Sequence, residues 1–449
     1  MTTSPRFRLG AAALLASAIA SVPAHAAMGN IATNYGIFPA DVGSAQGLSL
    51  FNPNISALHY NPAYLTTDPR GELSVGLLHG DQELRARSLG GSNPVDRDGR
   101  VLNDTDSQQL VLGLKTDLSG LTTFEHPIYF GVLVGIERYS DELLSFESRT
   151  AEEGQFFSYG RQPLFLQLGG ATELLHGINA GASVNLTLQA NANMRAVSNL
   201  AGDTSREDVR VSANPIIRPV LSTNLELDKI FCGRKSDCGI FSDVEMAFAF
   251  RGRTKYDANI DANITIPGTV PEPGIDLMIN TMDSYTPDIY VGGIHIPLTD
   301  KLRVAASLEW QRWEDLGRRL GNDTVRDVAE ARFRDITVPR LGLEWQVNDT
   351  LGLTAGFAYQ ERALRSLRTP DVNYFDNDKT IIGLGGHLTI QEPPLLMYPL
   401  RLDFGYQYQM LDDRNFELST TRPGVDNPYE VVRTDGDVHV FSGSITLKF

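Results

Sequence analysis

The sequence predicts an all-β protein: a transmembrane antiparallel β-barrel of about 14 strands, with an N-terminal segment folded inside the lumen. Three observations support this prediction. Apolar and polar residues alternate with a period of two over stretches of roughly ten residues, the length that a tilted strand needs to cross a bilayer. Long polar connections alternate with mostly short ones, as at the two rims of an outer-membrane barrel. The last stretch also alternates, and it ends on the aromatic residue Phe449.

The chain begins with the three parts of a secretory signal peptide. Arg6 and Arg8 form a basic region, Leu9–Val22 is an apolar stretch of 14 residues, and Ala24-His25-Ala26 is a small-x-small cleavage site. We therefore expect residues 1–26 to be removed. We expect no transmembrane helix, because no other segment approaches ~18 uninterrupted apolar residues.

Residues 27–70 precede the first predicted strand and form the expected plug. Glycine and proline punctuate this segment, which also carries apolar residues such as Ile37, Phe51 and Leu65. A disordered tail would hold fewer apolar residues, and so short a folded piece cannot bury enough surface alone. A barrel of this width is not filled by its own side chains, so we expect the segment to pack inside it.

The barrel is expected over residues 71–449. Its strands should lie near 71–80, 108–117, 128–139, 161–173, 177–189, 208–226, 242–262, 286–297, 301–313, 332–347, 351–360, 380–390, 399–410 and 438–449. The even number places both termini on the periplasmic side. The lumen should be polar, because the inward positions include Arg251, Arg303, Glu309, Arg340, Glu344, Arg401 and Asp403.

Charge and cysteine content narrow the possible partners. The signal peptide takes two of the 39 basic residues and none of the 55 acidic residues, which leaves a net charge of −18. Such a surface repels polyphosphates, so we expect no nucleic-acid partner. The periplasm permits a disulfide between Cys232 and Cys238 that staples a loop, whereas a metal site would need more soft ligands than the neighbouring residues offer.

The stretch Ser56–Ala63 (SALHYNPA) resembles a motif of the FadL family of outer-membrane transporters for long-chain fatty acids and other hydrophobic compounds. Three later segments are similar to the family's later hairpins and to a short motif after one of them: Asp300–Leu316, Val338–Gln360 and Thr369–Asp371. The resemblance implies a hatch that plugs a fourteen-stranded barrel, with Asn61, Pro62 and Ala63 as its motif. Two departures concern the ligand class more than the fold: the small-residue run Val42–Gly47 is degenerate, and Tyr64 stands where the family tends to have glycine.

The resemblance also implies a ligand route. A pocket near the mature N-terminus would involve Ala27, Met28 and Ile31. A kink in the third strand would open a lateral exit, and Gly131 and Gly135 are the strand-weakening residues there.

Spacing alone suggests a collector for apolar ligands in the outer loop 263–285. Ile275, Met278, Ile279 and Met282 follow helical i, i+3, i+4, i+7 spacing, which predicts an apolar stripe on a helix. Flexible methionines suit varied apolar ligands. Met194, Val197 and Ala201 repeat the spacing in loop 190–207. The alternative is that both stripes pack their loops onto the barrel rim.

These features predict an uptake channel for hydrophobic compounds (long-chain fatty acids, alkanes or aromatic hydrocarbons) in the outer membrane of a Gram-negative bacterium. The charged lumen keeps a diffusion porin for polar solutes as the alternative. We expect no enzyme, cofactor or metal, because GxSxG, HExxH and paired CxxC motifs are missing and Asp371–Asp378 does not match an EF-hand loop. Expected partners are outer-membrane lipid and lipopolysaccharide, and the assembly machinery that reads Phe449. We expect a monomer, and we expect Asn61 to tie the plug to the inner wall.

Overall fold

The computed structural model describes residues 35–96, 99, 107–121, 123, 126–138, 164–198, 204–232, 238–266, 270–321, 331–365, 375–394, 396–420 and 424–449. The expected signal peptide and residues 27–34 lie outside this part of the chain. Among the described helices, none is both long and apolar enough to cross a membrane.

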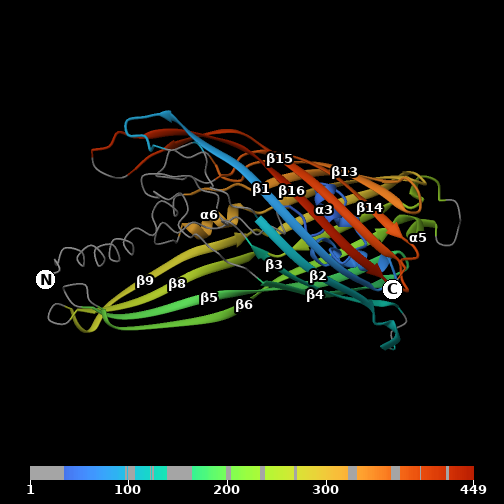
Figure 1. Cartoon of the computed structure of the whole chain (residues 1–449), viewed down its shortest axis with the longest axis horizontal. Helices are drawn as coiled ribbons and strands as arrows, with labels where there is room; N and C mark the ends of the chain where they lie inside the picture. The colour runs from blue at the N-terminus through green and yellow to red at the C-terminus, as the bar shows by residue number, and fades with distance from the viewer. Residues whose placement is uncertain are drawn as a thin grey trace.

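Fourteen strands form a closed antiparallel barrel, as predicted (Figure 1). They are β1 (Glu72–Gly90), β2 (Ser107–Asp117), β3 (Ile128–Arg138), β4 (Leu164–Leu175), β5 (Ile178–Ser198), β6 (Thr204–Glu226), β7 (Glu245–Arg251), β10 (Ile289–Thr299), β11 (Leu302–Gln311), β12 (Ile336–Gln346), β13 (Leu351–Gln360), β14 (Lys379–Ile390), β15 (Leu400–Leu418) and β16 (Glu430–Lys448). Pairing of β1 with β16 closes the barrel, and Gly71 exchanges two backbone hydrogen bonds with Phe449 at 2.7 and 2.9 Å. Side chains alternate between the two faces of the wall: on β1 the even-numbered residues point inward and the odd-numbered residues point outward.

The predicted strand over 242–262 is wrong in one respect, because the structure divides it into β7 and β8 (Thr254–Ile266). The pairing of β6 with β7 ends at Val220 and Arg251. The next residue of β6 is Pro219, which has no N–H to donate, and Gly252 donates to its carbonyl at 2.8 Å. The chain therefore leaves the barrel wall after Arg251.

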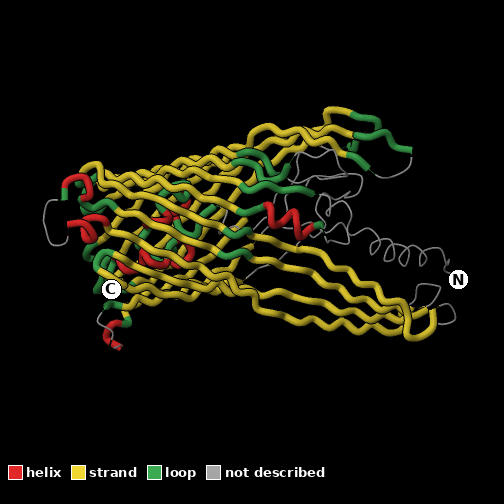
Figure 2. The backbone as a smooth tube through the Cα atoms, turned by 180° about the vertical axis from the view of Figure 1, so that it is seen from behind, coloured by secondary structure: helices red, strands yellow, loops and turns green. Residues whose placement is uncertain are grey.

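Beyond this point, β8 and β9 (Val270–Thr286) form a hairpin outside the barrel wall. The outer part of β5 pairs with β8 in parallel, and β6 runs along the other edge of β5, so four strands extend together from one side of the barrel (Figures 1 and 2). The expected helical stripes are therefore wrong, both for Ile275, Met278, Ile279 and Met282 and in loop 190–207. The free edge of β5 offered a pairing that the spacing of the apolar residues could not reveal.

The extracellular end carries a packed cap. It contains α6 (Glu314–Leu320) and an isolated bridge between Phe333 and Leu364. Asp376 accepts the amide of Leu364 and lies 3.9 Å from the guanidinium of Arg414. Side chains of the cap belong to one buried apolar cluster with the inner faces of β1, β15 and β16.

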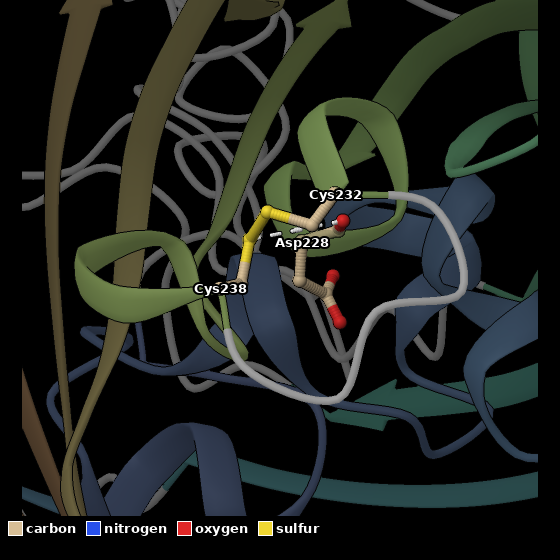
Figure 3. The surroundings of a disulfide bond; sticks show 3 residues. All are labelled: Asp228, Cys232 and Cys238. Carbon is tan, nitrogen blue, oxygen red and sulfur yellow. Dashed lines mark hydrogen bonds between the residues drawn. A yellow bond between two sulfur atoms is a disulfide. The ribbon is translucent and has the colours of Figure 1, made fainter.

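The connection between β6 and β7 lies on the periplasmic side and is stapled. It contains α5 (Leu227–Cys232) and η5 (Gly239–Phe241), and Cys232 and Cys238 form a disulfide beside Asp228 (Figure 3). Another short helical turn, η4 (Ser119–Leu121), lies between β2 and β3.

The N-terminal segment lies inside the barrel as a plug (Figure 1). Its described part, residues 35–70, contains four short helical turns: α3 (Pro39–Gly43), η2 (Ser49–Phe51), α4 (Ala57–Tyr60) and η3 (Pro62–Thr67). Pro39 and Pro62 each begin a turn, where a missing N–H costs nothing and the fixed φ favours the helix. Most of its residues are buried, including Ile37, Val42 and Leu58.

Candidate functional site

The candidate site is the contact between the plug and the inner wall, since any solute that crosses the lumen must pass it. Residues 39–48 of the plug lie directly on glycines of β12–β15. A Cβ on Gly383 would come within 2.6 Å of the Ala45 nitrogen, and one on Gly43 within 2.7 Å of the Gly385 Cα. A Cβ on Gly356 would overlap the Ser44 carbonyl. Here the two backbones touch, because wall glycines leave room that no other residue would leave.

The opposite side of the plug uses wall glycines in another way. Ile55 and Leu58 point at Gly131 of β3, where an added Cβ would lie 2.8 Å from Ile55 Cδ1 and 3.0 Å from Leu58 Cδ1. Ile55 also covers Gly113 of β2. Plug side chains therefore fill the space above these two strands.

Hydrogen bonds from the wall hold the ends of the plug's helical turns. Gln167 Nε2 and Ser183 Oγ donate to the carbonyl of Leu58, at 2.7 and 2.6 Å. The Ala63 amide donates to Ser222 Oγ at 2.8 Å. These bonds satisfy plug backbone groups that the short helical turns leave free.

Asn61 does not tie the plug to the wall, so that expectation is wrong. Its side-chain amide is fully buried and donates to the carbonyl of Leu50 at 2.7 Å, which joins two turns within the plug. Within the Asn-Pro-Ala motif, Ala63 contacts the wall through its hydrogen bond to Ser222. The backbones of Pro62 and Ala63 also pack on Gly181 of β5.

A charged cluster lies against the middle of the plug. Arg251 and Glu309 are 2.6 Å apart and almost fully buried, and Arg340 lies 3.9 Å from Glu309. Arg340 also donates to the Ala45 carbonyl at 2.9 Å, and the Arg251 guanidinium stacks over the Tyr60 ring at 5.5 Å. The charged inner wall is therefore engaged by the plug at this level.

The last turn of the plug is fastened to the periplasmic rim. Lys448 Nζ lies 2.8 Å from Asp68 Oδ2, and Lys115 Nζ donates to the Asp68 carbonyl at 2.6 Å. Burial alone would raise the pKa of Asp68, but hydrogen bonds from Arg70 and the charge of Lys448 hold that pKa well below its usual value. Asp68 is thus a fixed anion that links the plug to β16.

An apolar path connects the extracellular cap with the plug. One buried cluster contains cap residues such as Phe333 and Leu364, inward-facing wall residues such as Leu84 and Val438, and Tyr35 and Val42 of the plug. The inner wall is therefore polar beside one part of the plug and apolar beside another.

Comparison with known proteins identifies this architecture. The family model described as "Outer membrane protein transport protein (OMPP1/FadL/TodX)" matches residues 242–449. Alkane uptake protein A of Marinobacter nauticus is 45% identical over all of this chain and 98% of its own length.

The chain belongs to the FadL family.

Solved structures agree with this fold. A FadL homologue of Pseudomonas aeruginosa has 14% sequence identity and a TM-score of 0.57, over 91% of this chain and 98% of its own. The monoaromatic hydrocarbon channel CymD has 14% identity and a TM-score of 0.51, over 93% of this chain and 98% of its own. As a FadL-family protein, the chain is an outer-membrane channel of a Gram-negative bacterium that takes up hydrophobic compounds, and an open porin is not favoured.

The third strand of this FadL-family barrel keeps its register at the place where a kink is expected. β3 pairs with β2 and with β4 without a shift of register through Gly131 and Gly135. Both glycines receive a side chain: Gly131 is covered by Ile55 and Leu58, and Gly135 by Phe165. These glycines thus accommodate side chains without interrupting the strand.

The other expected site residues are dispersed. Ala27, Met28 and Ile31 lie outside the described residues. Ile275, Met278, Ile279 and Met282 lie on β9, in the hairpin that extends beyond the barrel wall. Sequence reasoning missed the wall glycines that contact the plug. Their signal was glycine at inward positions of the strands, as at Gly342, Gly356 and Gly383.

Proposed function

We propose that this FadL-family channel takes up alkanes, holds them beside the plug and releases them laterally into the outer membrane. The observation that carries the proposal is the 45% identity with an alkane uptake protein along the whole chain. The apolar cluster between cap and plug supports it, because an alkane has no group that could replace the hydrogen bonds of a polar lumen.

The proposed route follows the apolar side of the lumen. It begins at cap residues such as Phe333 and Phe375, passes the inner faces of β1 and β16 at Leu84 and Val438, and reaches the plug at Tyr35 and Val42. These side chains are packed, so passage requires local movement in the cap and the plug.

Lateral release is proposed beside Gly113 and Gly131. The inner face of β2 and β3 has no side chain of its own at these positions and is covered by Ile55 and Leu58 of the plug. A shift of α4 would uncover this part of the wall, where an apolar ligand could enter between the strands.

Two plug leucines offer a matched test of this exit. Leu58 covers Gly131 on β3, and Leu50 lies on Gly293 of β10, with its Cδ2 2.8 Å from where a Cβ would be. Each change to alanine should cost roughly 2–5 kcal/mol of stability. Leu58→Ala should increase hexadecane uptake several-fold, whereas Leu50→Ala should not. Equal effects of the two changes would contradict an exit at β3.

Uptake in cells tests the proposed function itself. A deletion strain with and without the gene should differ in uptake of radiolabelled hexadecane by about tenfold, and small hydrophilic solutes should enter equally. Oleate and toluene in parallel assays distinguish alkanes from fatty acids and aromatic hydrocarbons. Equal hexadecane uptake with and without the protein would refute the proposal.

A further inference from the structure

The outer surface of the barrel carries an apolar groove of about 950 Å³ across β15, β16, β1, β2 and β3. Its lining includes large apolar side chains that are turned away from the lumen and exposed, among them Leu77, Leu110, Phe404, Phe441 and Ile445. In an outer-membrane barrel this surface faces lipid.

The floor of the groove is Gly443. The register places Phe404, Gly443, Leu77, Leu110 and Ile136 side by side in one row across the five strands. Along β16, the outward neighbours of Gly443 are Phe441 and Ile445. Because Gly443 has no side chain, its position leaves a gap that large apolar side chains enclose. A Cβ placed there would have no neighbour closer than the Asp403 carbonyl, at 4.0 Å.

Another outward glycine shows that such a gap is not inevitable. Gly292 of β10 lies between Phe248 and Leu308 in its own row, with the same kinds of neighbour. There the Phe248 ring leans over the glycine, at 3.4 Å from where a Cβ would lie. At Gly443 neither Phe404 nor Leu77 does so, and the space stays open.

The groove has a polar border on one side only. Toward the extracellular end, His79 and Gln108 line its edge, and the next outward positions of β1 are Asp81 and Glu83. Toward the periplasm the outward residues stay apolar, with Leu73 on β1 and Leu114 on β2 both exposed. A ligand with an alkyl chain and a polar end at the outer surface matches this asymmetry.

We propose that the groove binds an acyl chain of lipopolysaccharide, the amphiphile whose polar part lies at the outer surface of this membrane. The chain would lie over Gly443, and its polar attachment would reach the level of His79 and Gln108. The acyl chain leaves the apolar interior of the membrane for an apolar groove. Its binding therefore rests on close dispersion contact with the side chains around Gly443, not on the hydrophobic effect.

The test compares retained lipid on the full-length folded protein by native mass spectrometry. Wild-type protein in detergent, mixed with defined lipopolysaccharide, should keep one bound molecule that resists detergent washing. Gly443→Leu fills the gap and should reduce retention at least fivefold, whereas Gly292→Leu should retain lipopolysaccharide as the wild type does. Heat-modifiable electrophoresis checks that both variants are folded.

Each alternative occupant gives its own result. Equal retention by Gly443→Leu and wild type would overturn the proposal. So would a preference for phosphatidylethanolamine over lipopolysaccharide at this gap, or displacement of the lipid by hexadecane, which would make the groove a site for cargo. Hexadecane uptake by cells is measured separately, so failure of this proposal leaves the proposed transport function intact.

Discussion

At Gly356 the plug backbone lies against the barrel wall with no room for a side chain. The Ser44 carbonyl occupies the position that a Cβ would take. Because both contacting groups are backbone, neither can move aside without shifting a strand or a turn of the plug. The plug therefore fits against the wall only because such glycines carry a hydrogen atom where every other residue carries a Cβ.

Gly356→Ala should displace the plug while the barrel still assembles. Overpacking of this kind costs about 1–3 kcal/mol, and the displaced plug should admit large hydrophilic antibiotics that wild-type cells exclude. Gly292→Ala, where a Cβ makes an ordinary contact at 3.4 Å, is the matched control. Unchanged antibiotic sensitivity in Gly356→Ala, with a folded barrel, would show that the contact does not seal the lumen.

Asn61 gives a second prediction at the scale of one residue. Asn61→Ala leaves the Leu50 carbonyl unpaired in a buried site, which should destabilise the plug by about 1–3 kcal/mol and raise permeability more than it impairs assembly. Asn61→Leu keeps a similar volume but has no donor, so it should be at least as permeable in the antibiotic assay. A tolerated leucine would mean that the hydrogen bond is not the reason for asparagine here.

At the scale of elements, β7, β11 and β12 each contribute one member of the charged cluster that lies against the middle of the plug. Arg251, Glu309 and Arg340 are buried together, so their charges are stable only in combination.

Glu309→Gln should leave two buried guanidinium groups without a counter-charge and lower the free energy of unfolding by about 3–5 kcal/mol. Urea unfolding in detergent, followed by tryptophan fluorescence, measures the loss. Glu314→Gln breaks the exposed pair of α6 with Arg318 and should change stability by less than about 1 kcal/mol. Similar losses for the two variants would argue against a tightly coupled interior cluster.

The extracellular cap should become more stable in mild acid. Burial raises the pKa of Asp376, against the opposing effects of the Leu364 amide and Arg414. The folded cap therefore holds a proton more tightly than the unfolded cap, so its stability rises as pH falls through the raised pKa toward the ordinary value of about 4. Hydrogen exchange of residues 361–365, corrected for intrinsic rates, should slow as the pH is lowered from neutral toward about 4.

Asp376→Asn cannot titrate and should remove this dependence on pH. The same acid-induced slowing in the variant would assign it to another group. Faster exchange of the wild type in acid would mean that the ion pair with Arg414 outweighs burial.

The whole molecule is a wide barrel with a short segment packed in its lumen and a cap at its extracellular end. A deletion of residues 35–70 should convert it into an open pore with a charged inner wall. In planar bilayers the deletion should show a steady, large conductance, whereas the intact protein should stay closed or open briefly. An equal steady conductance of the intact protein would support a porin.

Several parts of the fold follow from local pattern. Period-two alternation predicted the barrel and the approximate place of most strands, since each wall strand must present one face to lipid and the other to the lumen. The break after Arg251 was missed because it depends on Pro219 of the neighbouring strand. The strand conformation of β9 was missed because a helical spacing of apolar residues says nothing about a free edge on β5.

The sequence by itself determined the barrel, its approximate strand number and the plug in its lumen, because these depend on periodicity and on the composition of residues 27–70. Only the tertiary structure decided which residues form the site. The plug and its partners on the wall are far apart in the chain: Ala63 and Ser222 are separated by 159 positions, and Ser44 and Gly356 by even more. A glycine at an inward position has the same local pattern whether it faces a plug, a side chain or empty space. Closure of the barrel brings the two surfaces together, and so the contact exists only in three dimensions.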